Sequence, residues 1–292
     1  MSQKFYKYQG AGNDFLIADN RDGSIRLTEG RIAALCDRRY GVGADGLMLL
    51  ESPDTYIPEE GVLSRSQDGF KMTYFNSDGS GGMMCGNGGR CIVAFAADMG
   101  IDNFSFMAAD GWHRADVIFS EGKTRIVKLL MKDVKSYEHH DSLTGVSVQS
   151  DGYFLDTGTR HYVRVVEGLD DYDVVGEGRD IRYNAAELQP VGANVNFIEP
   201  AEDGVLKVRT YEKGVEDETY ACGTGIVASC IAAYKAGIKP SETGRNHVVY
   251  DVKAKRDRLK VSFRPLDMFN GVAEDVYLIG PATFVAEIIC EI

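Results

Sequence analysis

The sequence predicts an α+β fold of two homologous domains related by a pseudo-two-fold axis, because one half of the chain repeats the other. Residues 72–100 (MTYFNSDGSGGMMCGNGGRCIVAFAADMG) align without a gap to residues 209–237 (RTYEKGVEDETYACGTGIVASCIAAYKAG), at an offset of 222 − 85 = 137. The identical pairs include Thr73 with Thr210, Tyr74 with Tyr211, Cys85 with Cys222, Gly86 with Gly223, Gly88 with Gly225, Ala96 with Ala233 and Gly100 with Gly237. Weaker repeats flank this block: GAGND (10–14) resembles DTGTR (156–160), and GADGLMLL (43–50) resembles GANVNFIE (192–199). A repeat of this length indicates a duplicated domain, since solenoid repeats are far shorter.

Both copies predict the same local structure. The segments KMTYF (71–75) and LKVRTYE (206–212) favour strands, because they contain β-branched and aromatic residues. A glycine- and aspartate-rich loop in the first copy, and its counterpart in the second, lead to the cysteine and then to helical patterns at 89–99 and 226–236. Gly100 and Gly237 suit the C-terminal caps of these helices. We therefore expect each cysteine at, or just before, a helix N-terminus.

The rest of the chain predicts many strands and few helices, which is typical of α+β domains. A helix is expected near 28–39, with Thr28 as its N-cap. Further strands are expected near residues 5–9, 15–19, 47–51, 114–119, 125–131, 162–166, 195–198, 205–211, 259–263 and 276–279, with one more at 282–292.

The duplication also predicts where the domains divide. We expect the first domain to cover residues 1–130 and carry Cys85, and the second to cover residues 131–281 and carry Cys222. The junction is expected near residues 120–145, where polar turns mix with a strand. The last strand, 282–292, could return to either domain.

Composition narrows the functional classes. The chain has 292 residues and a formal net charge of −12, from 44 acidic and 32 basic residues. Such an acidic surface repels phosphate backbones and anionic lipids, so we expect neither nucleic acid nor membrane partners. The N-terminus has no apolar signal segment and no apolar run is long enough to span a bilayer, so a cytoplasmic protein is expected. The oligomeric state stays open, with a homodimer as one option.

The six cysteines are expected to be free thiols, because the chain is long and lacks a secretion signal. There is no C-x-x-C pair, so neither a zinc ribbon nor a thioredoxin-type site fits. Apart from Cys85 and Cys222, the cysteines are interpreted as structural: Cys36, Cys91 and Cys230 within helical patterns, and Cys290 near the end of the chain.

Three other patterns are interpreted as structural. The segment GVGADG (41–46) has the G-x-G-x-x-G spacing, but a dinucleotide fingerprint needs a strand before it and a helix after it. Here a helix precedes and a strand follows, which predicts a turn. His139 and His140 are expected in a solvated loop rather than a metal site, and Trp112 is expected in the core.

Two thiols at helix N-termini predict acid–base chemistry. The exposed N–H groups and the helix dipole favour a thiolate by about 0.3–1 kcal/mol, up to about 2 kcal/mol when partly buried, which lowers the thiol pKa by about one unit. A pair of such groups can flank one carbon, so that a thiolate removes a proton while the opposite thiol donates one and the stereocentre inverts. The amides after each cysteine can hold a carboxylate on which charge develops, each worth roughly 2.7–4 kcal/mol. A lone cysteine beside glycines is more often inert, but two in register favour this functional interpretation.

At these residues the sequence resembles the diaminopimelate epimerase family over nearly its whole length. The matching blocks are GAGNDFLIAD, RRYGVGADGLMLL, YFNSDGS followed by MCGNGGRC, GANVNF, and YEKGVEDETYACGTG. The resemblance implies two similar domains, each a mixed or antiparallel β-sheet rolled around a central helix, with the site in the cleft. It also implies interconversion of L,L- and meso-2,6-diaminopimelate in lysine and peptidoglycan-precursor biosynthesis, without pyridoxal phosphate, metal or another cofactor.

The resemblance also implies roles for particular residues. Cys85 is similar to the base that acts on the L,L-isomer and Cys222 to its partner acid, with the roles exchanged for the meso-isomer. The substrate-binding residues that it implies are Asn13, Asn76 and Asn194, Glu212 for the distal ammonium, the amides of Gly86–Asn87 and Gly223–Thr224 for the carboxylate, and His161 to orient Glu212 or the reacting centre. An asparagine in a glycine-rich loop can equally be a turn former, and His161 a structural residue.

Two departures from the family pattern affect recognition of the distal end. Thr159-Arg160 stands where the family has Asn-Pro, so Thr159 can still donate a hydrogen bond but with a shorter reach. Lys213 follows the site glutamate where an arginine is frequent, which removes a bidentate fork for the distal carboxylate.

Two alternative functions remain at this point. A racemase or epimerase of the same superfamily could act on another amino acid, and a panel of amino acids distinguishes the two. A non-catalytic dithiol protein, such as a redox sensor or binding module, would not exchange substrate α-protons with solvent.

Overall fold

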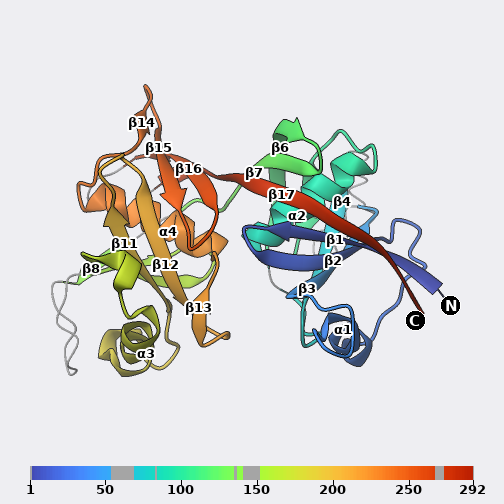
Figure 1. Cartoon of the computed structure of the whole chain (residues 1–292). Coiled ribbons are helices and arrows are strands. Elements are labelled where there is room, and N and C mark those ends of the chain that lie inside the picture. Colours follow the sequence, from blue (N-terminus) through green and yellow to red (C-terminus); the bar gives the residue numbers. More distant parts are fainter. Residues whose placement is uncertain are drawn as a thin grey trace, which may run out of the picture. The chain divides into compact units, whose positions relative to one another are not determined.

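The computed structural model describes residues 2–53, 69–82, 84–134, 137–140, 152–266 and 273–291. The chain divides into two compact units, and Figure 1 labels most of their elements: unit 1 comprises residues 1–129 and 280–292, and unit 2 comprises residues 130–279. Part of the expected junction, residues 135–136 and 141–145, lies outside the described residues, as does Ile292 of the last expected strand.

Unit 1 is a closed barrel of mixed strands. Among the described residues its elements are β1 (Ser2–Gly10), β2 (Asn13–Asp19), α1 (Glu29–Cys36), β3 (Gly46–Glu51), β4 (Phe70–Asn76), α2 (Gly86–Asp98), β5 (Ser105–Ala108), β6 (Gly111–Glu121), β7 (Thr124–Leu130) and the end of β17 (Ala273–Glu291). The pairs β2–β3 and β4–β5 are parallel, whereas β1–β2, β3–β4, β5–β6, β6–β7, β7–β17 and β17–β1 are antiparallel. These pairings return to the strand from which they start, so the described strands of unit 1 form a closed ring without an open edge.

Unit 2 repeats this order of pairings. Its elements among the described residues are β8 (Tyr137–His140), β9 (Gly152–Asp156), β10 (Arg160–Val165), α3 (Val174–Asn184), β11 (Asn194–Pro200), β12 (Leu206–Glu212), β13 (Asp217–Thr219), α4 (Gly223–Lys235), β14 (Glu242–Thr243), β15 (Val248–Lys253), β16 (Arg258–Pro265) and the start of β17, with short 3-10 turns at Leu169–Asp171 and Ala186–Leu188. The pairs β10–β11 and β12–β15 are parallel, as β2–β3 and β4–β5 are in unit 1. The pairs β8–β9, β9–β10, β11–β12, β15–β16 and β16–β17 are antiparallel. The α+β fold of two similar units is therefore confirmed.

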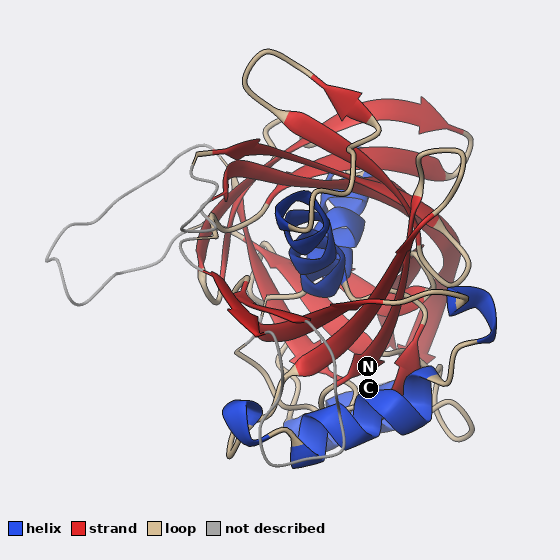
Figure 2. Ribbon diagram, turned by 90° about the vertical axis from the view of Figure 1, so that its left-hand side faces the viewer, coloured by secondary structure: helices blue, strands red, loops and turns tan. Residues whose placement is uncertain are grey.

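The central element of each unit is the helix that follows the cysteine. Residues Gly86 to Ala96 of α2 are all buried, and so are most residues of α4 from Gly223 to Ala233. A helix that is apolar on every side requires apolar neighbours on every side, and the rolled sheet supplies them. Figure 2 shows such a helix inside a ring of strands. Gly100 and Gly237 adopt left-handed backbone angles, φ +78° and +77°, just after these helices, as their sequence position predicts.

The last strand of the chain serves both units. The sequence predicts two strands, at 276–279 and 282–292, separated by Gly280 and Pro281, but β17 runs unbroken from Ala273 to Glu291. It pairs with β16 up to Ile279 and with β7 from Gly280 onward, so its partner changes where the sequence suggests a break. Proline is tolerated in a strand where no ladder hydrogen bond from its nitrogen is needed. Division of the chain into compact units groups residues 280–292 with unit 1.

Two single-residue expectations are wrong. Trp112 is 48% exposed rather than in the core, because its neighbour His113 faces inward and stacks on Phe106, and successive strand residues point to opposite faces. The backbone of His139 and His140 belongs to β8, paired with β9, and not to a loop. Thr28, by contrast, caps α1 as expected, with its side chain accepting a hydrogen bond from the Arg31 N–H group.

Several elements have no counterpart in the sequence interpretation, above all α3. Its sequence, VVGEGRDIRYN, contains two glycines and few apolar residues. The helix begins at Asp173, whose carboxylate accepts the Gly176 N–H group, and it buries Val174, Gly178 and Ile181. Within the part of the chain that the structure describes, no helix is both long and apolar enough to cross a membrane.

Close packing of α3 on β12 gives a first prediction. A Cβ atom at Gly178 would lie 2.4 Å from the Cβ of Tyr211, a distance that real contacts do not show. We expect Gly178→Ala to lower the free energy of unfolding by about 1–3 kcal/mol, because one of the two elements must shift. Gly30→Ala is the matched control, since a Cβ there meets nothing within 4 Å and alanine favours a helix. Urea unfolding checks both variants, and equal stability for the two would contradict the packing argument.

Candidate active site

Cys85 occupies the N-cap of α2, which confirms its predicted position. Its backbone is extended (φ −116°, ψ 118°), and its sulfur accepts the Gly88 N–H group at 3.4 Å. The other N–H groups of a first helical turn have no partner within the helix, so they favour a negative charge beside them. A Cβ at Gly88 would lie 3.2 Å from the sulfur of Met48 and 3.4 Å from Cβ of Cys85, so the turn is tightly packed.

Asn13, at the start of β2, lies beside this thiol. Its Oδ1 atom is 3.7 Å from the Cys85 sulfur, which donates to it, and 3.5 Å from the Nδ2 atom of Asn87. Asn87 is 2% exposed, and its own Oδ1 accepts from the fully buried Arg90 at 3.0 Å. The structure thus brings Asn13, Cys85 and Asn87 together in one hydrogen-bonded group.

Asp45 completes this group and was missed by the sequence interpretation. Its Oδ2 atom accepts the Asn13 Nδ2 group at 2.6 Å, which orients the amide so that its oxygen faces the thiol. Arg38 donates to Asp45 at 2.6 Å. Asp45 lies in the segment interpreted only as a turn, but the internal repeat aligns it with Asn194, which was assigned to the site. The weaker repeat was therefore the signal that could have identified it.

Cys222 occupies the N-cap of α4, also with an extended backbone (φ −94°, ψ 112°), and is 8% exposed. Its sulfur lies 3.4 Å from Oγ1 of Thr224, the second residue of the helix. The Thr224 hydroxyl is in turn 3.1 Å from Oγ1 of Thr159 and 3.0 Å from Nε2 of His161. Three predicted site residues therefore converge on the surroundings of the second cysteine.

The hydrogen bonds of His161 define its protonation. Asn196, fully buried, donates through Nδ2 to the Tyr162 carbonyl at 3.2 Å and to His161 Nδ1 at 3.1 Å, and its oxygen accepts from Thr210. Because Nδ1 accepts, the neutral ring carries its proton on Nε2, which faces Thr159 and Thr224. Burial lowers the pKa of His161 from 6.5 to about 3, so the ring is neutral near pH 7. His161 thus orients the threonines next to Cys222, and Asn196 is a second residue that the sequence interpretation missed.

The same contact recurs in both units with different side chains. The repeats align Asn13 with Thr159 and Asn87 with Thr224. In unit 1 the side chains of Asn13 and Asn87 are in contact, with Nδ2 of Asn87 3.5 Å from Oδ1 of Asn13. In unit 2 the equivalent residues, Thr159 and Thr224, are also in contact, with their Oγ1 atoms 3.1 Å apart. The residue that follows the turn, at the start of β2 or just before β10, therefore lies next to the second residue of the central helix in both units.

A second cluster in unit 2 contains Asn194, which is expected to bind substrate, together with Glu212 and Lys213, which the resemblance relates to the distal end of the substrate. Asn194 donates to the Arg160 carbonyl at 3.1 Å, and its oxygen accepts the backbone N–H of Lys213 at 2.8 Å. The carboxylate of Glu212 accepts from Thr219 at 2.7 Å, and the Lys213 ammonium donates to the Val191 carbonyl at 2.8 Å.

Two further residues have contacts of a different kind. Asn76 accepts from the Tyr74 hydroxyl at 2.9 Å and donates to Ser80 at 2.9 Å, which fits the turn-forming interpretation as well as a binding role. The guanidinium of Arg160 lies over the Phe154 ring, 5.0 Å from its centroid.

The remaining cysteines are suited to structure rather than to proton transfer. Burial raises the pKa of Cys36 to about 11 and also raises the pKa values of Cys91, Cys230 and Cys290. Cys36, Cys91 and Cys230 are buried, as expected. These thiols stay protonated near neutral pH.

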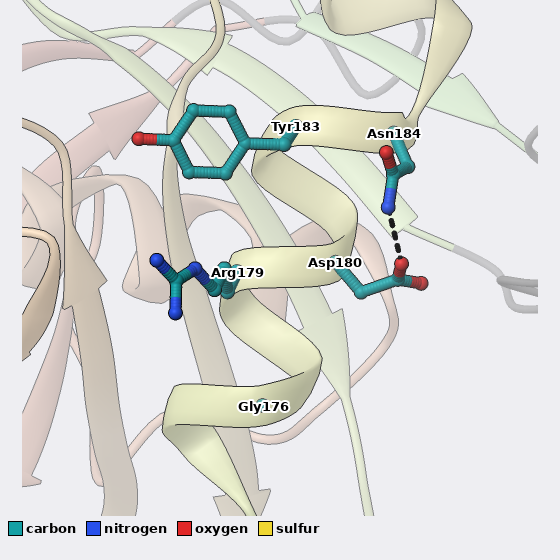
Figure 3. A pocket seen from close by; sticks show the side chains of 5 residues that line it. All are labelled: Gly176, Arg179, Asp180, Tyr183 and Asn184. Carbon is teal, nitrogen blue, oxygen red and sulfur yellow. Dashed lines mark hydrogen bonds between the residues drawn. The ribbon is translucent and has the colours of Figure 1, made fainter.

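A surface hollow of about 510 Å³ lies along α3, and all of its lining residues belong to this helix. Figure 3 shows its lining residues, with Arg179 and Tyr183 on one side of the helix and Asn184 hydrogen-bonded to Asp180 on the other. None of the residues predicted for the site lines this hollow.

Solved structures share this fold. A phenazine biosynthesis protein of the PhzF family from Bacillus anthracis superimposes with a TM-score of 0.69 at 15% identity, over 100% of both chains. A probable proline racemase from Agrobacterium radiobacter K84 gives a TM-score of 0.64 at 14% identity, covering 99% of this chain and 92% of the other. The fold of this chain is therefore the one that these two structures have in common.

The chain belongs to the diaminopimelate epimerase family, and it is an isomerase that acts on a small molecule. The profile of that family matches residues 5–127 and 153–258. A diaminopimelate epimerase from Flavobacterium psychrophilum is 40% identical over 287 residues, which cover 97% of this chain and 98% of that protein.

The buried neutral histidine gives a prediction on pH dependence. Because its folded pKa lies below 6.5, the unfolded chain binds a proton between about pH 3 and 6.5 that the folded chain does not. Stability must therefore fall as the pH falls below 6.5, by up to about 1.4 kcal/mol per pH unit from this group. Urea unfolding gives the free energy of unfolding of the wild type and of His161→Asn at each pH. We expect the difference between the two to become smaller as the pH falls from 6.5 to 3. A difference independent of pH would contradict the buried neutral ring.

Proposed function

We propose that the enzyme interconverts L,L- and meso-2,6-diaminopimelate, with Cys85 and Cys222 as a thiolate–thiol pair acting on one carbon. The observation that carries the proposal is the repeated device: each cysteine caps the buried central helix of its unit. Membership of the family and the name of its relatives support the choice of substrate. The same family membership supports a place in the formation of lysine and of peptidoglycan precursors.

The reaction needs one proton removed and one added on opposite faces of the α-carbon. In our proposal the Cys85 thiolate takes the α-proton of the L,L-isomer, and the electron pair of the broken C–H bond moves into the carboxylate as an enediolate-like species. The Cys222 thiol donates its proton to the opposite face and becomes the thiolate. The meso-isomer is converted back by the same steps in reverse, so atoms and charge balance without a further reactant.

The α-carboxylate would be held by the amides that open the two helices, at Gly86–Asn87 and Gly223–Thr224. Unpaired N–H groups at a helix start, supported by the helix dipole, stabilise charge that develops on this carboxylate. Such stabilisation is needed because a thiolate is too weak a base to remove the α-proton unaided. In unit 1 the Gly88 N–H group is engaged by the Cys85 sulfur, which leaves the carboxylate to the two residues before it.

The distal end of the substrate would be recognised in unit 2. The Glu212 carboxylate is proposed to bind the distal ammonium, and Lys213 and Asn194 to serve the distal carboxylate. Both Asn194 and the backbone of Lys213 belong to one hydrogen-bonded group, so they would respond together to a substrate. A lysine offers a single charged group where an arginine offers a fork, which implies looser orientation of that carboxylate.

The cysteine pair is tested by substitution. We expect Cys85→Ala and Cys222→Ala each to lower kcat by at least roughly 10²–10⁴-fold, because each removes a proton donor or acceptor, and the double variant to be scarcely worse. The assay follows epimerisation of L,L-diaminopimelate by the metal- and pyridoxal-free enzyme, with α-proton exchange in heavy water measured by NMR. Cys290→Ala is the control, because this partly exposed thiol lies outside both helix N-termini. Near-normal turnover by either single variant would exclude the two-thiol mechanism.

The distal end is tested at Glu212. Glu212→Gln removes a charge-assisted hydrogen bond worth roughly 1.5–3 kcal/mol, so binding of diaminopimelate should weaken by about ten- to a hundredfold. Glu202→Gln makes the same change in net charge at an exposed position and should bind normally. Binding is measured by calorimetry on enzyme with Cys222→Ala as background. Unchanged affinity in Glu212→Gln would remove the assignment of the distal ammonium to this residue.

A further inference from the structure

Glu216 collects an unusual number of hydrogen bonds for a residue on a surface turn. Its carboxylate accepts from Arg182 Nε at 2.8 Å and Nη2 at 2.6 Å, from the Tyr183 hydroxyl at 2.8 Å, from the Tyr211 hydroxyl at 3.1 Å and from the Gly214 N–H group at 3.0 Å. The guanidinium beside it, more than any other group, lowers the pKa of Glu216 to about 2. The carboxylate is therefore charged near neutral pH.

The backbone at Glu216 is also specialised. Its φ angle is +60°, a left-handed conformation that side chains other than glycine, asparagine and aspartate seldom adopt. In this conformation its N–H group donates to the Glu212 carbonyl at 2.8 Å and closes the turn between β12 and β13. The main chain and the side chain of one residue thus both secure the turn that carries Glu212 and Lys213.

Arg182, the ion-pair partner of Glu216, also contacts a second loop. Arg182, on α3, accepts through its carbonyl from Gln189 at 2.8 Å. A Cβ at Gly192 would lie 2.4 Å from the Arg182 guanidinium, so the loop before Asn194 packs directly on this side chain. The Lys213 ammonium reaches the same loop, at the Val191 carbonyl.

We propose that the Glu216–Arg182 ion pair is a positioning device for the distal end of the substrate. It holds the turn with Glu212 and Lys213 and the loop with Asn194 in one arrangement, and so favours an amino acid with a charged distal end over one without. Glu216 and Arg182 act through these residues and are positioning residues, not catalytic ones. This inference rests on the proposed function.

The test uses the full-length enzyme and two variants of the pair, Glu216→Gln and Arg182→Lys. Glu177→Gln is the matched control, because Glu177 lies on the same helix and forms its ion pair at 3.3 Å with Arg164, on β10. We expect the pair variants to raise KM for L,L-diaminopimelate by about tenfold while kcat changes by less than about threefold, since only binding of the distal end is loosened. The control should match the wild type in both.

A second ligand separates positioning from general damage. L-2-aminoheptanoate has the same seven-carbon chain without the distal ammonium and carboxylate, and its affinity is measured as competitive inhibition. We expect its inhibition constant to be the same in the wild type and both pair variants. Equal weakening of both ligands, or a loss of kcat without a change in KM, would overturn the proposal.

Amide hydrogen exchange gives a readout that does not depend on the substrate. We expect exchange in the segment 212–217 to be faster in the pair variants and unchanged in Glu177→Gln. If the wild type does not epimerise diaminopimelate but segment 212–217 exchanges faster in the pair variants, the substrate assignment is wrong. The conclusion that the ion pair stabilises the turn is then still supported. If the segment exchanges at the wild-type rate in both pair variants, the pair does not hold the turn and the inference is wrong.

Discussion

The enclosure of one apolar helix in each unit is the constraint on which the rest of the structure depends. Because α2 and α4 are buried on nearly every side, each unit must surround its helix with sheet, and the helix must begin where the chain enters that enclosure. Its first N–H groups then have no sheet partner, and a cysteine stands at the entry in both cases. The same packing that stabilises the unit therefore places the cysteine beside unpaired N–H groups, which favour a negative charge at this position.

Both halves of the duplicated chain keep a cysteine at the N-cap of the central helix, but the side chains around it differ. In unit 1 the thiol meets the amide of Asn13, which is oriented by the charged Asp45. In unit 2 the thiol meets the hydroxyl of Thr224, which is oriented by a buried neutral histidine. The two cysteines thus occupy the same position in their units but have different hydrogen-bond partners.

The fold and the substrate are set by different parts of the chain. Proteins with 14–15% identity share the whole architecture, yet one is a phenazine biosynthesis protein and another a probable proline racemase, so the barrels alone do not select a substrate. Selection requires groups placed at a defined distance from the reacting carbon. In our proposal such groups lie on the turn after β12 and the loop before β11, and both segments form hydrogen bonds with α3 or with each other.

The duplication was visible as a repeat in the sequence itself. Local patterns were sufficient for both central helices with a cysteine at the N-cap and for the Thr28 cap, because each depends on residues within one or two turns of chain. The family resemblance added the site asparagines, Glu212 and His161. The unbroken course of β17, the outward side of Trp112 and the helix α3 came only from the structure, since each depends on packing against another element. The same holds for Asp45, Asn196 and Glu216, whose importance lies in hydrogen bonds to side chains on other elements. Periodicity and capping are local properties that a sequence can display, whereas the orientation of a side chain by its neighbours exists only once the chain has folded.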